Sequence, residues 1–152
     1  MAHTPVNHPA RPVYRAIGGL VGLYFVVFGV IGMITTAGNG AFAQDQALKV
    51  LGQGANLGFS LLAIVLGAAI LAGVAIGRNL DVAINQWLSY ALMLLGLAQL
   101  AFLHTDANIF NFSIMTVIVV LTLAMVLLMA GMYSKVGTEE EKEAWQKARL
   151  VL

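Results

Sequence analysis

The stretch FSIMTVIVVLTLAMVLLMAGMY, Phe112–Tyr133, decides the fold class of this chain. It contains no charged side chain over about twenty residues, the length that an α-helix needs to cross the roughly 30 Å hydrocarbon core of a bilayer. Backbone N–H and C=O groups inside lipid must pair within the protein, so such a segment is expected to be helical.

Three other uncharged apolar segments of similar length precede it. The four predicted spans are residues 16–36, 57–77, 83–103 and 112–133. The composition agrees, since 60% of the 152 residues are hydrophobic and only 10% are charged, against about a quarter charged in a soluble domain. No segment alternates as the strands of a membrane β-barrel do. The sequence therefore predicts an all-α fold, an integral membrane four-helix bundle.

The basic residues lie almost entirely on one side of this predicted transmembrane domain, residues 16–136. Seven of the eight Lys and Arg residues fall in the two terminal segments or in the connection between the second and third spans, and only Lys49 lies opposite. Loops with excess Lys and Arg stay in the cytoplasm. We therefore expect a multi-pass protein of the cytoplasmic membrane with both termini inside, and with segments 37–56 and 104–111 outside.

The segments outside the spans carry weaker signals. Residues 1–15 contain three prolines and two arginines and are expected to form a flexible basic tail. Phe42–Leu51 is expected to form a short helix on the outer membrane surface. Residues 137–152 predict an amphipathic cytoplasmic helix, which either lies against solvent and membrane or docks on a partner. The residues expected to share its docking face are Trp145, Ala148 and Leu152.

Small residues recur at four-residue spacing in the first two spans, a pattern that allows helices in lipid to approach closely. They serve either packing within the bundle or contact with another subunit, and both roles are structural. These predicted contact residues are Gly18, Gly22, Ala69, Gly73 and Gly77.

The densest polar cluster of the apolar region is HTDANIFNF, residues 104–112. Its simplest interpretation is a turn, in which Asp106 or Asn108 ends one helix and Asn111 or Ser113 caps the next. A sensing role for His104 and a metal or cofactor site are the alternatives, but two ligands make a poor metal site. Together with Gln99, about one helical turn below, His104 and Asp106 form a possible outer polar site.

The predicted spans contain no Asp, Glu, Lys, Arg or His, and the chain has no cysteine. Proton carriers and intramembrane enzymes normally need an ionisable group at depth, and the missing thiols exclude disulfides and thiolate chemistry. We therefore expect no catalytic residue, metal or cofactor. The sequence favours a non-catalytic accessory subunit of a larger membrane complex, or a homo-oligomer, with membrane lipid around it and no nucleic-acid partner.

A second interpretation belongs to a different class of function. A small carrier or binder of a lipid, a quinone or another apolar molecule needs a cavity rather than charges. The polar contacts of such a ligand would be Tyr24, Tyr90, Gln99 and His104.

Several segments, taken together, resemble a family of small four-span membrane proteins common in actinobacteria, a numbered domain of unknown function. They are NHPARPVYRAIGGLVGLYFVVFGVIG, GRNLD and LLGLAQLAFLHTDANIFNFS, and the resemblance covers about residues 7–137. It implies a four-helix membrane topology and carries no activity or catalytic residue onto named positions.

Overall fold

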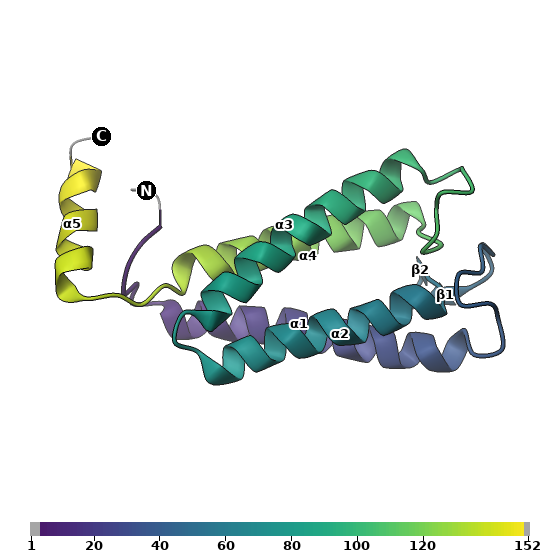
Figure 1. The fold of residues 1–152 in the computed structure, drawn as a ribbon, viewed down its shortest axis with the longest axis horizontal. Helices are drawn as coiled ribbons and strands as arrows, with labels where there is room; N and C mark the ends of the chain where they lie inside the picture. Colours follow the sequence, from purple (N-terminus) through teal and green to yellow (C-terminus); the bar gives the residue numbers. More distant parts are fainter. Residues whose placement is uncertain (1–3, 151–152) are drawn as a thin grey trace.

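The computed structural model describes residues 4–150 and contains four long helices and one short one (Figure 1). The long helices have 20 to 25 residues each, and all four are long and apolar enough to cross a membrane. The predicted all-α four-helix bundle is therefore confirmed. The helices are α1 (Arg11–Thr35), α2 (Leu57–Ile76), α3 (Leu80–Ala101), α4 (Ile114–Tyr133) and α5 (Glu139–Leu150).

The bundle consists of two helical hairpins laid against each other. Helix α1 packs mainly along α2, and α3 packs mainly along α4, with less extensive α1–α4 and α2–α3 contacts (Figure 1). We call the end with the start of α1, the α2–α3 turn and α5 the terminal end. The opposite end, with the connections 36–56 and 102–113, is the loop end.

The core between the hairpins combines aromatic and aliphatic side chains. Phe25, Phe28 and Phe59 are buried from the α1–α2 hairpin, while Leu92 and Leu127 are buried from α3 and α4. Phe28 and Phe59 meet edge to face, with ring centroids 5.6 Å apart, a favourable arrangement of aromatic quadrupoles.

Two glycines set the close contact between α1 and α2. A Cβ atom on Gly67 would lie 2.5 Å from the backbone oxygen of Gly22, and one on Gly22 would lie 3.1 Å from the oxygen of Gly67. Main chains therefore touch at this crossing, which small residues permit in lipid.

The membrane helices begin earlier than the predicted spans at the terminal end. Helix α1 starts at Arg11 rather than residue 16, with proline in its first turn, where a missing N–H costs nothing. Helix α3 starts at Leu80 rather than residue 83. The predicted spans start after the nearest charged residue, whereas the helices include these residues because Arg11 and Arg15 each pair with Asp81.

The helix predicted for Phe42–Leu51 is wrong. The segment contains turns and the first strand of a small antiparallel hairpin, in which β1 (Lys49–Val50) pairs with β2 (Gln53–Gly54), Lys49 with Gly54 and Val50 with Gln53. Leu51 and Gly52 both have positive φ, 50° and 79°, which a tight hairpin turn requires and a helix forbids. Upstream, the Asp45 carboxylate accepts a bond from the Ala47 backbone N–H (2.8 Å), a local alternative to helix.

The N-terminal segment differs from the predicted flexible tail. Pro5 and Val6 are buried, and Asn7 N–H donates to the Lys135 carbonyl at 3.0 Å. The ring of His8 meets Tyr14 and Tyr133 edge to face, with centroids 5.6 and 5.4 Å away. Residues 5–10 therefore pack against the terminal end, because apolar and aromatic side chains there offer them a surface.

Candidate functional sites at the two ends of the bundle

A buried carboxylate, Asp81, lies in the first turn of α3 at the terminal end. Its side chain has no exposed surface, and its Oδ2 is 3.0 Å from Arg15 Nε and 3.8 Å from Arg11 Nη2. The amino end of a helix carries a partial positive charge, which also favours an anion there. Asp81 therefore faces three positive groups: two guanidiniums and the helix terminus.

The two arginines extend this cluster to the other helices. Arg15 Nη2 donates to the Val74 carbonyl in the last turn of α2, and Arg11 Nε donates to the Ser134 carbonyl at 2.8 Å, just after α4. The last carbonyls of a helix have no partner within it. Three side chains from α1 and α3 thus tie all four membrane helices together, and we call Arg11, Arg15 and Asp81 the charge cluster.

Asn85 lies one helical turn beyond Asp81 and is 1% exposed. Its amide nitrogen and oxygen make no hydrogen bond with residues 4–150. Two glycines give it room, since a Cβ on Gly18 would lie 2.9 Å from its Nδ2 and one on Gly131 would lie 3.2 Å from its Cβ. The close approach of α1, α3 and α4 at this level therefore depends on glycine at positions 18 and 131.

Sequence reasoning missed this site. Asp81 was assigned to the connection GRNLD, so the conclusion that no ionisable residue enters the helices is wrong for Asp81, Arg11 and Arg15. A signal was present, because Arg11 and Arg15 are four residues apart, as are Asp81 and Asn85. Four-residue spacing places each pair on one face of a helix, where polar residues indicate a buried partner.

Two asparagines hold the connection between α4 and α5. The Asn79 amide donates to the Val136 carbonyl and accepts from the Val136 N–H, both at 2.7 Å. Asn7 does the same for Gly137, at 2.9 and 3.1 Å. In each pair, one side-chain amide bonds both the N–H and the C=O of the same residue, as a paired β-strand would. These bonds position the start of α5. Figure 1 shows the result, with α5 running across the long axis of the bundle.

Two of the three predicted docking residues of the tail share one groove. Trp145 and Ala148 of α5 line it together with Val6 and Val82, and its volume is about 550 Å³. The third, Leu152, lies outside the described residues. A docking role for this face stays a prediction.

The predicted helix-packing residues lie within the bundle. A Cβ on Gly18 would meet α3, and one on Gly22 would meet α2. A Cβ on Gly73 would lie 3.0 Å from Ile84 Cδ1, and one on Gly77 would lie 3.1 Å from Arg15 Nη2. Ala69 is partly buried in α2. These glycines therefore contact other parts of the same chain.

The loop end is held by neutral amides. Asn56 caps α2 by accepting from Phe59 N–H at 3.0 Å, and its amide also donates to the Ala43 and Ile109 carbonyls at 3.2 and 2.8 Å. Asn111 donates to the Asp45 and Ala55 carbonyls at 2.7 and 3.2 Å. Each side chain joins two connections that are distant in sequence, so the two loops form one unit.

The turn interpretation of HTDANIFNF is confirmed for Ser113 and modified for the rest. Ser113 is the N-cap of α4 and forms a reciprocal capping box with Thr116. Asn108 braces the turn by bonding Leu103 and Phe112. Asp106 does not cap α3, which ends at Ala101 with Phe102 as its C-cap. The prediction that Asp106 or Asn108 ends this helix is therefore wrong for both residues, since Asn108 lies within the turn.

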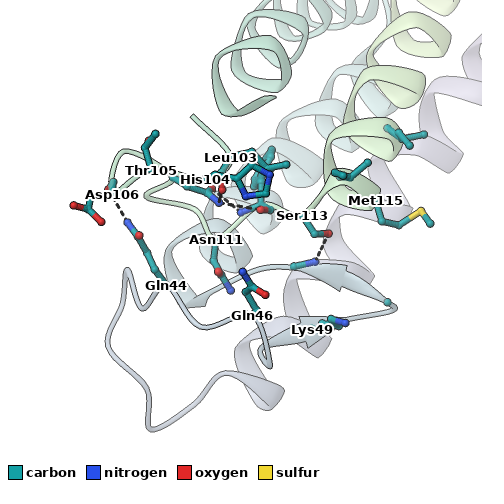
Figure 2. A pocket seen from close by; sticks show the side chains of 16 residues that line it. Gln44, Gln46, Lys49, Leu103, His104, Thr105, Asp106, Asn111, Ser113 and Met115 are labelled. Carbon is teal, nitrogen blue, oxygen red and sulfur yellow. Dashed lines mark hydrogen bonds between the residues drawn. The ribbon is translucent and has the colours of Figure 1, made fainter. Parts of the chain in front are cut away.

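His104 and Asp106 both line an open hollow of about 730 Å³ at the loop end (Figure 2). Gln99 is not among its lining residues; it is buried in α3, 5% exposed. Within residues 4–150 no three His, Asp or Glu side chains gather as metal ligands.

The four residues predicted to contact an apolar ligand between the helices do not lie together. The Tyr24 hydroxyl accepts a bond from Gln53 Nε2 at 2.5 Å in the loop end, rather than meeting Tyr90. Tyr90 is 52% exposed on the outside of the bundle. Of the four residues predicted for such a ligand, His104 alone lines the hollow.

No protein-family model, curated protein or solved structure matches the chain. The family resemblance of residues 7–137 therefore remains a prediction, and the functional argument depends on the chain's own geometry.

Proposed function

We propose that this protein is a non-catalytic subunit of the cytoplasmic membrane that works by contact, either with copies of itself or with a larger membrane complex. Both termini lie in the cytoplasm in this proposal, because the terminal end carries most of the Lys and Arg residues.

The observation that carries the proposal is a seam on the outside of α3. Its most exposed large side chains are Trp87, Leu94 and Leu97, which are 73%, 71% and 56% exposed. The outward positions alternate in steps of three and four, the spacing of helices that pack along a shared axis. The seam consists of Leu80, Ala83, Trp87, Tyr90, Leu94 and Leu97.

Tyr90 distinguishes this seam from an ordinary lipid-facing surface. It lies near the middle of the 22-residue helix α3, about 15 Å from either end at 1.5 Å per residue. Its ring meets Trp87 edge to face at 6.4 Å, but its hydroxyl makes no hydrogen bond with residues 4–150. A hydroxyl in hydrocarbon without a partner is costly, and tyrosines in membranes favour the interfaces. A second protein helix at this depth would supply the missing partner.

The bundle's own charges support a role without catalysis. Asp81, the acid buried within the membrane helices, is bound by Arg15 and Arg11. Arg15 is in turn bonded to the Val74 carbonyl in α2, and Arg11 to the Ser134 carbonyl just after α4. The charge cluster therefore joins helices, through ion pairs to Asp81 Oδ2 and through the arginine–carbonyl bonds, while Asp81 Oδ1 makes no hydrogen bond with residues 4–150.

The test is native mass spectrometry of the protein released from membranes in a mild detergent. We expect a homo-oligomer or a stoichiometric complex, weakened at least several-fold by Leu94→Ala and by Tyr90→Phe. Matched controls are Leu20→Ala on α1, where Leu20 is 65% exposed, and Thr122→Val on α4, whose hydroxyl is satisfied by the Ile118 carbonyl at 2.8 Å.

A lone monomer would contradict the proposal. An assembly weakened by Leu20→Ala and unaffected by both α3 variants would place the contact on another face and contradict the role of the seam.

A further inference from the structure

The hollow at the loop end has two kinds of wall. Its rim carries polar side chains from both connections, and one wall is apolar, formed by the segment just after α3 and by the start of α4 (Figure 2). The polar rim includes Gln44, Gln46, Lys49 and His104, and the apolar wall consists of Leu103, Ile114, Met115 and Ile118.

The apolar wall continues onto the outer surface of the bundle. Ile114, Met115 and Ile118 are 59%, 53% and 53% exposed, on the first turns of a helix apolar enough to cross a membrane. The first turn of such a helix lies where the hydrocarbon core meets the headgroups. The hollow therefore opens at headgroup depth, with acyl chains below and water above.

The rim offers two side chains whose hydrogen-bond donors the protein itself does not use, while the amide of a third, Gln44, donates to the Asp106 carbonyl at 2.7 Å. Within residues 4–150, neither the Lys49 ammonium nor the His104 imidazole makes a hydrogen bond or ion pair. The first turn of α4 has no acidic residue. Asp106 is the acidic residue of the lining, and Figure 2 shows its carboxylate directed away from His104. The hollow is therefore better suited to an anionic group than to a cation.

We propose that the hollow binds the phosphate-bearing headgroup of a glycerophospholipid. Lys49 contacts the phosphate, His104 and the amide of Gln46 contact the polar part of the headgroup across the hollow, and the acyl chains run along Met115 and Ile118. The volume of about 730 Å³ falls within the roughly 300–1,000 Å³ of ligand sites. This site is separate from the α3 seam and does not depend on the proposed contact function.

The experiment measures thermal stability and native-mass-spectrometry adducts of the full chain in a nonionic detergent. Three probes are added at equal concentration: phosphatidylglycerol, diacylglycerol of the same chains, and inorganic phosphate. We expect adducts and a raised melting temperature with phosphatidylglycerol, and little or no effect of the other two. Lys49→Gln and His104→Gln should each weaken phosphatidylglycerol binding at least several-fold.

The matched control is Lys147→Gln, which removes an exposed lysine from α5 at the terminal end. Loss of binding in this control equal to that in Lys49→Gln would show non-specific attraction and overturn the site. Equal binding of diacylglycerol would overturn the role of the phosphate, and an equal effect of inorganic phosphate would overturn the lipid as its source. Full binding in both rim variants would also overturn the proposal.

Discussion

The two ends of the bundle solve the same problem with different chemistry. Each must satisfy backbone groups that helices leave unpaired at their termini. The terminal end uses ionised side chains: arginines on the carbonyl ends of α2 and α4, and Asp81 at the amino end of α3. The loop end uses neutral groups, chiefly the amides of Asn56 and Asn111.

The two ends differ in their connections rather than in their helix termini, since two amino ends and two carboxyl ends of the long helices meet at each. At the terminal end, charged side chains face helix termini of the opposite sign: the arginines lie at the carboxyl ends of α2 and α4, and Asp81 lies at the amino end of α3. At the loop end, the amino ends of α2 and α4 are capped by Asn56 and Ser113 within long connections. A side chain that both donates and accepts is suited to such connections, because it can join two loops at once.

Loss of Arg15 should produce the largest effect. Arg15→Met keeps much of the side-chain volume but leaves Asp81 buried with one distant guanidinium, which costs about 3–5 kcal/mol in comparable sites. Unfolding followed by circular dichroism in detergent measures the change. Arg78→Met is the matched control, because Arg78 is exposed in the α2–α3 turn, and it should change stability by less than about 0.5 kcal/mol.

Asn56→Ala tests the loop end and should lower the free energy of unfolding by less than Arg15→Met does. It removes the α2 cap and leaves the Ala43 and Ile109 carbonyls without this donor, a loss of about 1–3 kcal/mol. Asn39→Ala, on an exposed turn with one long bond of 3.4 Å, is the control in the same unfolding assay. A cost above that of Arg15→Met would reverse the proposed ranking of the two ends.

Asn79→Gly separates the placement of α5 from the stability of the bundle. Glycine keeps the positive φ of 65° at this position but removes both bonds to Val136. We expect about 1 kcal/mol or less of global destabilisation, with faster hydrogen exchange confined to residues 135–139. Unchanged exchange there would show that Asn7 alone holds the connection.

Lys142→Ala should have the smallest effect. Lys142 is paired with Glu139 at 3.1 Å on exposed α5, and such pairs contribute about 0.3–0.5 kcal/mol. The comparison with Arg15 tests whether burial, rather than charge alone, gives the terminal end its strength. A loss in the unfolding assay similar to that of Arg15→Met would refute this explanation.

The sequence predicted the parts of the fold that depend on long-range averages. Uncharged length identified the four helices, and the Ser113 cap followed from local turn chemistry. It did not predict the pairing of Asp81 with Arg15, because these residues are far apart in the chain and meet only after the helices pack. The hairpin at Lys49–Gly54 was missed for a similar reason, since Val50 gains its stability by burial against Gly32.

A double-mutant cycle on Arg15 and Asp81 tests the central claim that the charge cluster is a structural lock between helices. The free energy of unfolding is measured for Arg15→Met, Asp81→Asn and the double variant. If the two side chains stabilise each other, the free energy of unfolding falls in the double variant by about 1–3 kcal/mol less than the sum of the decreases in the two single variants. Strictly additive losses would show that the two side chains do not stabilise each other, and would contradict the claim.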